Sequence, residues 1–292
     1  RLMMDFKNAK ELLHLCEEAG NSISDIMLKR EIELGEISEI EALARMEKAF
    51  HIMRDSARTP IQTPVNSMGG LIGGEARKLS EHQAAGKGLC GPILEKAITY
   101  AMAVLETNSS MGLIVAAPTA GSAGIVPGLL LAFQESYDLS DDRMVKVLFN
   151  AGAIGYLAMR NATVAGAVGG CQAEVGVASA MAASAAVELM DGTPGQCLDA
   201  ASTVLMNMLG LVCDPVRGLV EYPCQNRNAA GVANSLIAAE MALAGIPQRI
   251  PLDEMIQVMY TVGKRIPAEL RETALGGCAT APSVCSGCNG CG

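Results

Sequence analysis

Apolar side chains recur at helical spacing through the charged first part of the chain. Between residues 7 and 57 they form two stripes, Leu12, Leu13, Leu15 and Cys16 in the first and Ile37, Ile40, Leu43 and Met46 in the second. Spacings of three and four residues place side chains on one face of an α-helix. We therefore predict amphipathic helix over residues 7–57, packed as a solvated outer layer on the rest of the protein.

From Gly91 onward the chain is rich in small apolar residues, and the pattern predicts further helices. They are expected at residues 92–108, 124–136, 141–160, 173–190, 196–212, 226–244 and 252–264. Asp141 and Asp142 after Ser140 are predicted to cap a helix N-terminus, and Gly192 and Gly245 are predicted helix ends. Only residues 112–117 suggest a strand, and that segment fits a helix equally well. The expected fold class is all-α, with a single multi-helix domain.

Two Thr-Pro pairs, at Pro60 and Pro64, are expected to end the outer layer. The predicted organisation is a charged helical leader at residues 1–58, one helical domain at residues 59–277, and a flexible tail rich in cysteine and glycine at residues 278–292.

Composition and charge exclude some classes of partner. The formal net charge is −9, and the chain has five tyrosines, four phenylalanines and no tryptophan, so nucleic acid is not an expected partner. Residues 1–10 lack the apolar segment of a signal peptide. The longest uncharged run, between Glu106 and Glu135, is interrupted by Pro118 and Pro127. We expect a cytoplasmic protein with no membrane partner.

Ten cysteines are unusual in such a protein and suggest chemistry. Cys16, Cys90 and Cys197 are expected to be buried structural thiols. Cys171, Cys213 and Cys224 each lie at a predicted helix boundary, beside glycine or proline. Helix N-termini favour thiolates at Cys171 and Cys224, and Cys213 ends a helix before Pro215. Three thiolates gathered at the ends of loops suit a metal or iron–sulfur centre. Their spacing fits no short-range metal motif, so buried structural cysteine is the alternative.

Two segments of small residues are candidate anion sites. Ala117–Pro127 is a turn before a helix, in which Thr119, Gly121 and Ser122 offer N–H and hydroxyl donors to a carboxylate or phosphate. Tight helix packing is the alternative interpretation. Two double glycines in residues 66–74 allow close backbone approach to another segment or to a ligand.

The tail contains Cys278 and then Cys285, Cys288 and Cys291, whose spacing opens a ferredoxin-type ligand run but lacks the fourth member. A terminus with inert thiols is the alternative. Among ionisable groups, His82 and Lys264 are candidate bases, although a surface position is the ordinary interpretation of both.

Several blocks of sequence together carry a resemblance to a known family. They are Ala117–Pro127, Ala151–Gly155, Gly170–Met181, Cys213–Val216, Pro223–Asn228, Gly263–Lys264 and Arg271–Thr273. In order and context they resemble the alpha subunit, or catalytic domain, of the iron–sulfur-dependent L-serine dehydratases (L-serine ammonia-lyases). The resemblance covers about residues 60–277.

The resemblance implies a helical catalytic domain in which Cys171, Cys213 and Cys224 hold a [4Fe–4S] cluster with one iron open. That iron would act as a Lewis acid on the hydroxyl of L-serine while a base removes the α-proton. The resulting aminoacrylate would hydrolyse to pyruvate and ammonia, as part of serine catabolism, without pyridoxal phosphate. The base stays open between His82, Lys264 and a group of another subunit.

By the same resemblance, the substrate carboxylate would bind at Thr119, Gly121 and Ser122, with contributions from Ser67, Gly69 and Gly70. Arg227 would pair with a carboxylate or orient Cys224.

Family members are single chains with an extra regulatory domain or separate alpha and beta subunits. We therefore expect an alpha subunit that works with a beta subunit in a hetero-oligomer. In single-chain relatives a C-terminal cysteine caps the open iron; Cys285 lies at about the family distance, and Cys291 is penultimate.

Other functions remain open at this point. A cysteine desulfidase of the same wider group would use a similar cluster, a ferredoxin-type protein would transfer electrons, and a purely structural helical protein would bind no iron.

Overall fold

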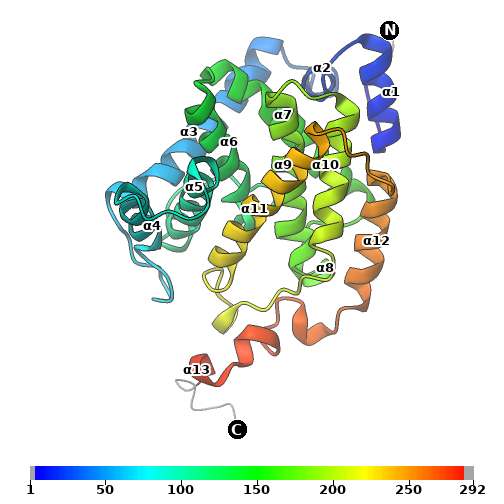
Figure 1. The fold of residues 1–292 in the computed structure, drawn as a ribbon. Helices are drawn as coiled ribbons and strands as arrows, with labels where there is room; N and C mark the ends of the chain where they lie inside the picture. The colour runs from blue at the N-terminus through cyan, green and yellow to red at the C-terminus, as the bar shows by residue number, and fades with distance from the viewer. Residues whose placement is uncertain (1–3, 286–292) are drawn as a thin grey trace.

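Helix α9 (Val177–Leu189) lies at the centre of a helical bundle in the computed structural model, which describes residues 4–285 (Figure 1). Every residue of α9 except Glu188 is buried. A helix that is apolar on all sides is stable only when other elements surround it. The surrounding helices are α6 (Ile125–Tyr137), α7 (Asp141–Asn161), α10 (Pro194–Asn207) and α11 (Cys224–Leu243).

Small residues let these helices approach α9 closely. A Cβ added at Gly231 of α11 would lie 2.6 Å from Ile125 Cδ1 and 2.7 Å from Ser179 Oγ. The Ser235 hydroxyl of α11 donates to the Ser179 carbonyl at 2.8 Å. The abundance of alanine, glycine and serine is therefore a packing requirement of this core.

The charged leader is helical, as predicted for residues 7–57, and it is divided into three helices. The helices are α1 (Ala9–Ala19), α2 (Ile23–Gly35) and α3 (Glu39–Gln62). Gly20 and Glu36 end the first two in the left-handed conformation, and the hydroxyls of Ser22 and Ser38 cap the next helix each time. These four residues mark turns that apolar spacing alone does not reveal.

Helix α3 continues through Pro60 to Gln62, past the expected break. Proline has no N–H, so the carbonyl of Ser56 loses its intrahelical donor. The Thr107 hydroxyl of α5 (Pro92–Ser109) donates to that carbonyl at 2.7 Å instead. A tertiary contact thus replaces the missing bond, and the helix crosses the boundary that we predicted at residue 58.

The helices predicted beyond Gly91 are confirmed, with different ends. Residues 173–190 form the π-helical turn η2 (Gln172–Gly176) followed by α9, and α10 ends at Asn207 rather than at residue 212. The last long helix is α12 (Leu252–Arg265). Residues 112–116 form a loop; within residues 4–285 the only β-type pairing is one isolated bridge between Cys213 and Arg271.

Shorter elements complete the fold. They are α4 (Glu75–Ala84), η1 (Ala120–Ser122), α8 (Gly166–Gly169), η3 (Val216–Gly218), η4 (Ala268–Leu270), η5 (Gly277–Thr280) and α13 (Pro282–Cys285). In Figure 1 the orange and red segment that follows α12 runs across the lower end of the bundle to α13. No helix among the described residues is long and apolar enough to cross a membrane.

Candidate functional site

The three cysteines at predicted helix boundaries come from three separate segments of the chain. Cys171 directly precedes η2, Cys213 lies in the segment that follows α10, and Cys224 is the first residue of α11. Their thiols interact electrostatically, since Cys171 and Cys224 both raise the pKa of Cys213. The fold therefore brings together thiols separated by 42 and 11 positions in the sequence.

Backbone pairing fixes Cys213. Its N–H donates to the Leu270 carbonyl at 2.9 Å, and its carbonyl accepts from the Glu272 N–H at 2.7 Å. The segment after α12 thus holds a residue that lies almost sixty positions earlier. Arg271, the bridge partner of Cys213, has a buried Nε with no hydrogen-bond acceptor among the described residues.

Arg227 ties Cys224 to Cys213. It lies one helical turn after Cys224, and its Nη1 donates to the Val212 carbonyl at 2.9 Å and to the Asp214 carboxylate. Both acceptors are direct neighbours of Cys213 in sequence. Arg227 therefore pairs with a carboxylate of the chain itself, and the same contacts hold the backbone beside Cys213 next to α11.

Gln172 fixes the backbone beside Cys171, as Arg227 does beside Cys213. The sequence alone assigned it no role. Its N–H donates to the Leu211 carbonyl at 3.0 Å, and its Oε1 accepts from the Gly210 N–H at 2.8 Å. Its Nε2 donates to the carbonyls of Gly169 and Met259 at 2.9 and 2.8 Å. One buried amide thus joins α8, α12 and the end of the α10 segment.

Glu174 is a second residue that sequence reasoning missed. Its Oε2 accepts from the Cys213 thiol at 3.8 Å. Burial raises the pKa of Glu174 above its ordinary value, and the charge of Glu272 raises it further. The neighbouring Thr119 side chain and Gly166 backbone lower the pKa of the same carboxyl. One feature of the sequence could have identified it: Glu174 is the only charged residue between Arg160 and Glu188.

The thiols do not have the low pKa values expected at helix N-termini. Burial raises the pKa of Cys171 and of Cys224 to about 12. Burial also raises the pKa of Cys213, and the charge of Glu174 and the other two thiols add to the effect. Desolvation and like charge therefore outweigh the helix dipole, and an isolated chain keeps these thiols protonated.

The turn at Ala117–Pro127 is joined to the cysteine site by Asn228. The Thr119 and Ser122 hydroxyls lie 3.0 Å apart. Asn228 is fully buried, and its Oδ1 accepts from the Gly124 N–H at 3.1 Å. Its Nδ2 donates to the carbonyls of Gly121 and Cys224, at 2.8 Å each. Sequence reasoning gave Asn228 no role either.

The glycine-rich segment binds a carboxylate of the chain itself. The Ser67 hydroxyl and the Gly69 N–H donate to Glu221 at 2.7 Å each, and the Leu71 N–H donates at 3.0 Å. Gly70 closes a turn through its N–H to the Ser67 carbonyl. The three donors of this segment are therefore engaged by Glu221 in the structure.

A buried carboxyl group, that of Glu106, lies next to the Cys224 helix. Glu106 Oε1 accepts from the Ala76 N–H at 2.9 Å and from Gln225 Nε2 at 3.1 Å. Its Oε2 has no donor among the described residues, and the carboxyl of Glu75 lies beside it. Burial raises the pKa of Glu106 to about 7, and Glu75 adds to the shift.

The remaining candidates lie elsewhere. His82 and Lys264 are exposed on α4 and α12, and Lys264 Nζ lies 4.3 Å from the centre of the Tyr260 ring. Cys16 and Cys197 are buried as expected, whereas Cys90 is exposed in the loop before α5. Cys278 donates through its N–H to Asp214. Cys285 ends α13, and its side chain, like Cys288 and Cys291, lies outside the described residues.

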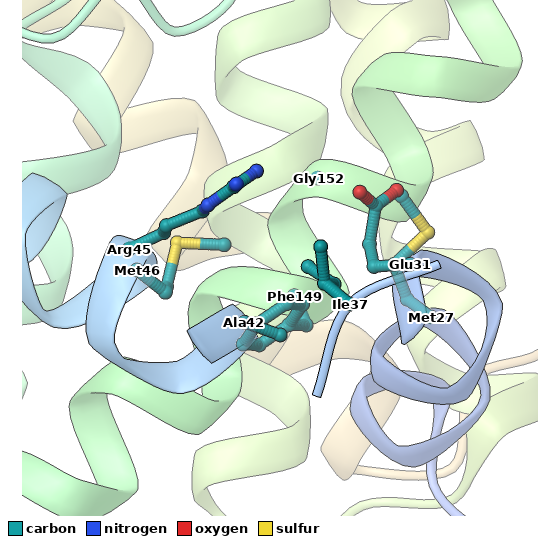
Figure 2. A pocket seen from close by; sticks show the side chains of 8 residues that line it. All are labelled: Met27, Glu31, Ile37, Ala42, Arg45, Met46, Phe149 and Gly152. Atoms are coloured by element: carbon teal, nitrogen blue, oxygen red, sulfur yellow. The ribbon is translucent and has the colours of Figure 1, made fainter. Parts of the chain in front are cut away.

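Within the described part of the chain, the thiol site is neither a single-ion metal site nor part of the apolar pocket between α2, α3 and α7. Among the described residues, no three His, Cys, Asp or Glu side chains surround one point as ligands of a single metal ion. Figure 2 shows a pocket between α2, α3 and α7 that is lined mainly by apolar side chains, with Glu31 and Arg45 as its charged groups. It contains no cysteine, so it is separate from the thiol site.

Comparisons with known proteins identify the family of the chain. Residues 18–279 match the family described as serine dehydratase alpha chain. A probable L-serine dehydratase alpha chain of Bacillus subtilis is 48% identical, over 95% of this chain and 92% of the relative. The L-serine dehydratase alpha chain of Peptoniphilus asaccharolyticus is 43% identical, over 93% of each chain. L-serine dehydratase 1 of Escherichia coli is 37% identical over 94% of this chain, which spans 61% of that protein. The chain therefore belongs to the serine dehydratase alpha-chain family.

Proposed function

We propose that the chain is the catalytic alpha chain of an L-serine ammonia-lyase that forms pyruvate and ammonia. Its centre would be a [4Fe–4S] cluster held by Cys171, Cys213 and Cys224. The observation that carries the proposal is the convergence of these three thiols, from three distant segments, around one half-buried carboxylate, Glu174. The names of the relatives supply the substrate class.

The donor set fits an iron–sulfur cluster better than a single ion. Thiolates are the usual ligands of such clusters, and each binds a different iron, so they need not surround one point. Bound cations reverse the electrostatic cost that keeps the three thiols protonated. The unpaired Nε of Arg271 is a donor available to an anionic group at this place.

The residues of the chain divide the remaining tasks. When bound, a cluster with an open iron supplies a Lewis acid for the leaving hydroxyl of serine. The hydroxyls of Thr119 and Ser122, with the backbone at Gly121, bind the substrate carboxylate. Asn228 fixes that turn relative to Cys224, and Arg227 fixes Cys213 relative to Cys224. Glu174 lies between the thiols and Thr119, where it can exchange a proton with bound substrate.

The roles proposed for the other candidates follow from their contacts. Ser67 and Gly69 donate to Glu221, so the carboxylate site is assigned to the Thr119–Ser122 turn alone. His82, Lys264 and a capping thiol at Cys285 stay predictions. The enzyme needs no pyridoxal phosphate in this scheme. A thiolate-bound cluster suits a reducing compartment, so we place the enzyme in the cytoplasm.

A second chain is part of the proposal. The alpha chains of B. subtilis and P. asaccharolyticus match this chain almost end to end, whereas the E. coli enzyme is much longer. Because these two relatives are named as alpha chains, we propose that this chain works with a separate beta chain in a hetero-oligomer.

Pyruvate release tests the function. The chain is reconstituted anaerobically with iron and sulfide, with and without a beta chain, and supplied with L-serine or L-cysteine. We expect pyruvate and ammonia in equal amounts from serine, with loss of activity in Cys213→Ala and retention in Cys197→Ala, a buried cysteine elsewhere. Pyruvate and sulfide from cysteine alone would indicate a desulfidase. A reversible one-electron titration without lyase activity would indicate electron transfer.

A further inference from the structure

Glu221 is a buried carboxylate outside the proposed catalytic set. It is 3% exposed, and no arginine, lysine or histidine among the described residues pairs with it. Its two oxygens are satisfied by three donors from one short loop, those of Ser67, Gly69 and Leu71. Removing a charge from water without a counterion costs free energy, and hydrogen-bond donors offset that cost. The contact between Glu221 and the loop at residues 67–71 therefore joins two distant segments of the chain.

The contact between Glu221 and the loop at residues 67–71 requires a glycine at position 69. A Cβ at that position would lie 2.8 and 3.0 Å from the two carboxylate oxygens of Glu221, and 2.2 Å from Leu219 Cδ1. The glycine therefore allows the carboxylate to reach the loop amides, which explains why the segment contains a glycine where sequence alone suggested a ligand site.

Glu221 is also joined to the segment between two proposed cluster ligands. Its carbonyl accepts from the Gln225 N–H at 3.0 Å, which closes the first turn of the helix that begins at Cys224. The next residue, Tyr222, accepts from the Val216 N–H at 2.9 Å. Residues 214–223, which connect Cys213 to Cys224, are thus folded back on themselves near Glu221.

The two ends of this connection are anchored differently. Arg227 holds the Cys213 end through Val212 and Asp214, and Glu221 holds the Cys224 end through the 67–71 loop. We propose that Glu221 is a positioning residue: its contact with the 67–71 loop sets the place of Cys224 relative to Cys213. The inference rests on the proposed function, because it assumes that both thiols bind the cluster.

Iron release tests this role without any activity measurement. Wild type, Glu221→Gln and Ser67→Ala are loaded anaerobically, and iron transfer to a ferrous chelator is followed by absorbance. A glutamine amide would direct an NH2 group at donors, and Ser67→Ala removes one donor to the carboxylate. Because partners that orient metal ligands typically contribute 10–100-fold to metal affinity, we expect release about tenfold faster in both variants.

A matched substitution separates positioning from general destabilisation. Ser24 donates to Glu188 with the same chemistry, at the end of α9 remote from Cys171. Ser24→Ala should lower the free energy of unfolding as Ser67→Ala does, yet leave iron release at the wild-type rate. Gly69→Ala should release iron as fast as Glu221→Gln, while Gly152→Ala, whose added Cβ meets nothing within 4 Å, should not.

The outcomes are distinct. Equal release rates in wild type, Ser67→Ala and Gly69→Ala would overturn the positioning role while leaving the cluster in place. Faster release in Ser24→Ala, in proportion to its lost stability, would also overturn it. A wild-type chain that takes up no iron would overturn the proposed function itself, and the positioning role with it.

Discussion

Removal of the Asn228 side chain should strongly destabilise the fold. It is fully buried, and it makes three hydrogen bonds between the Ala117–Pro127 turn and the first turn of α11. Asn228→Ala leaves the buried Gly124 N–H without an acceptor and the Gly121 carbonyl without its side-chain donor.

The magnitude follows from these contacts. A buried group left unsatisfied costs about 1–3 kcal/mol, and the Gly121 carbonyl, in a half-buried turn, regains part of its loss from water. We expect Asn228→Ala to lower the free energy of unfolding by about 2–4 kcal/mol. Asn228→Asp keeps the acceptor for Gly124 but replaces two donors with a charge that faces carbonyls, so it should be comparably damaging.

Urea unfolding followed by far-ultraviolet circular dichroism measures the effect. The control is Asn234→Ala on the same helix, which removes one exposed hydrogen bond to Asn207 and should cost less than about 0.5 kcal/mol. Asn228→Ala should also reduce iron retention, because Cys224 and the turn lose their connection. A stability within 0.5 kcal/mol of the wild type, as for the control, would refute the reasoning.

Three further predictions concern other parts of the molecule. Glu106→Gln should make the free energy of unfolding less dependent on pH. The pKa of Glu106 is raised from 4.5 to about 7, so between these pH values the folded chain holds a proton that the unfolded chain releases. The free energy of unfolding of the wild type should therefore fall as pH rises through this range. Urea titrations at pH 5 and pH 8 check this, and parallel pH profiles of variant and wild type would contradict it. Ser122→Ala should raise KM for serine roughly tenfold with unchanged cluster absorbance, since it removes one donor; loss of the absorbance would mean that the turn serves packing. Gly231→Ala should cost about 1–3 kcal/mol in urea unfolding because its Cβ meets Ile125 and Ser179, whereas Gly152→Ala should cost nothing, and equal stabilities would contradict the packing argument.

Local sequence signals predicted much of the fold. Helices beyond Gly91 follow from apolar runs of helical length, and α7 begins at Asp141, where the aspartates after Ser140 predicted a helix N-terminus. The leader shows the limit of this reasoning, because Gly20 and Ser22 separate helices that share one apolar pattern. Pro60 shows a second limit. The hydroxyl that replaces the missing hydrogen bond in its helix comes from Thr107, on a different helix.

The site was predictable only in part, for the same reason. Sequence context singled out the cysteines, but the contacts that fix them reach distant segments: Leu270 bonds to Cys213, and Gln172, next to Cys171, bonds to Gly210, Leu211 and Met259. The partner of the glycine-rich loop, Glu221, lies about 150 residues away. A carboxylate-binding loop can be recognised from its composition, whereas the identity of the carboxylate depends on the tertiary fold.

The most direct test of the account is the iron and sulfide content of the anaerobically reconstituted chain. Wild type and Cys197→Ala should bind about four iron ions per chain, as a [4Fe–4S] cluster requires, and Cys171→Ala, Cys213→Ala and Cys224→Ala should each lose them while remaining helical. Full iron content in these three variants, or none in the wild type, would contradict the central claim that these thiols meet to hold a cluster.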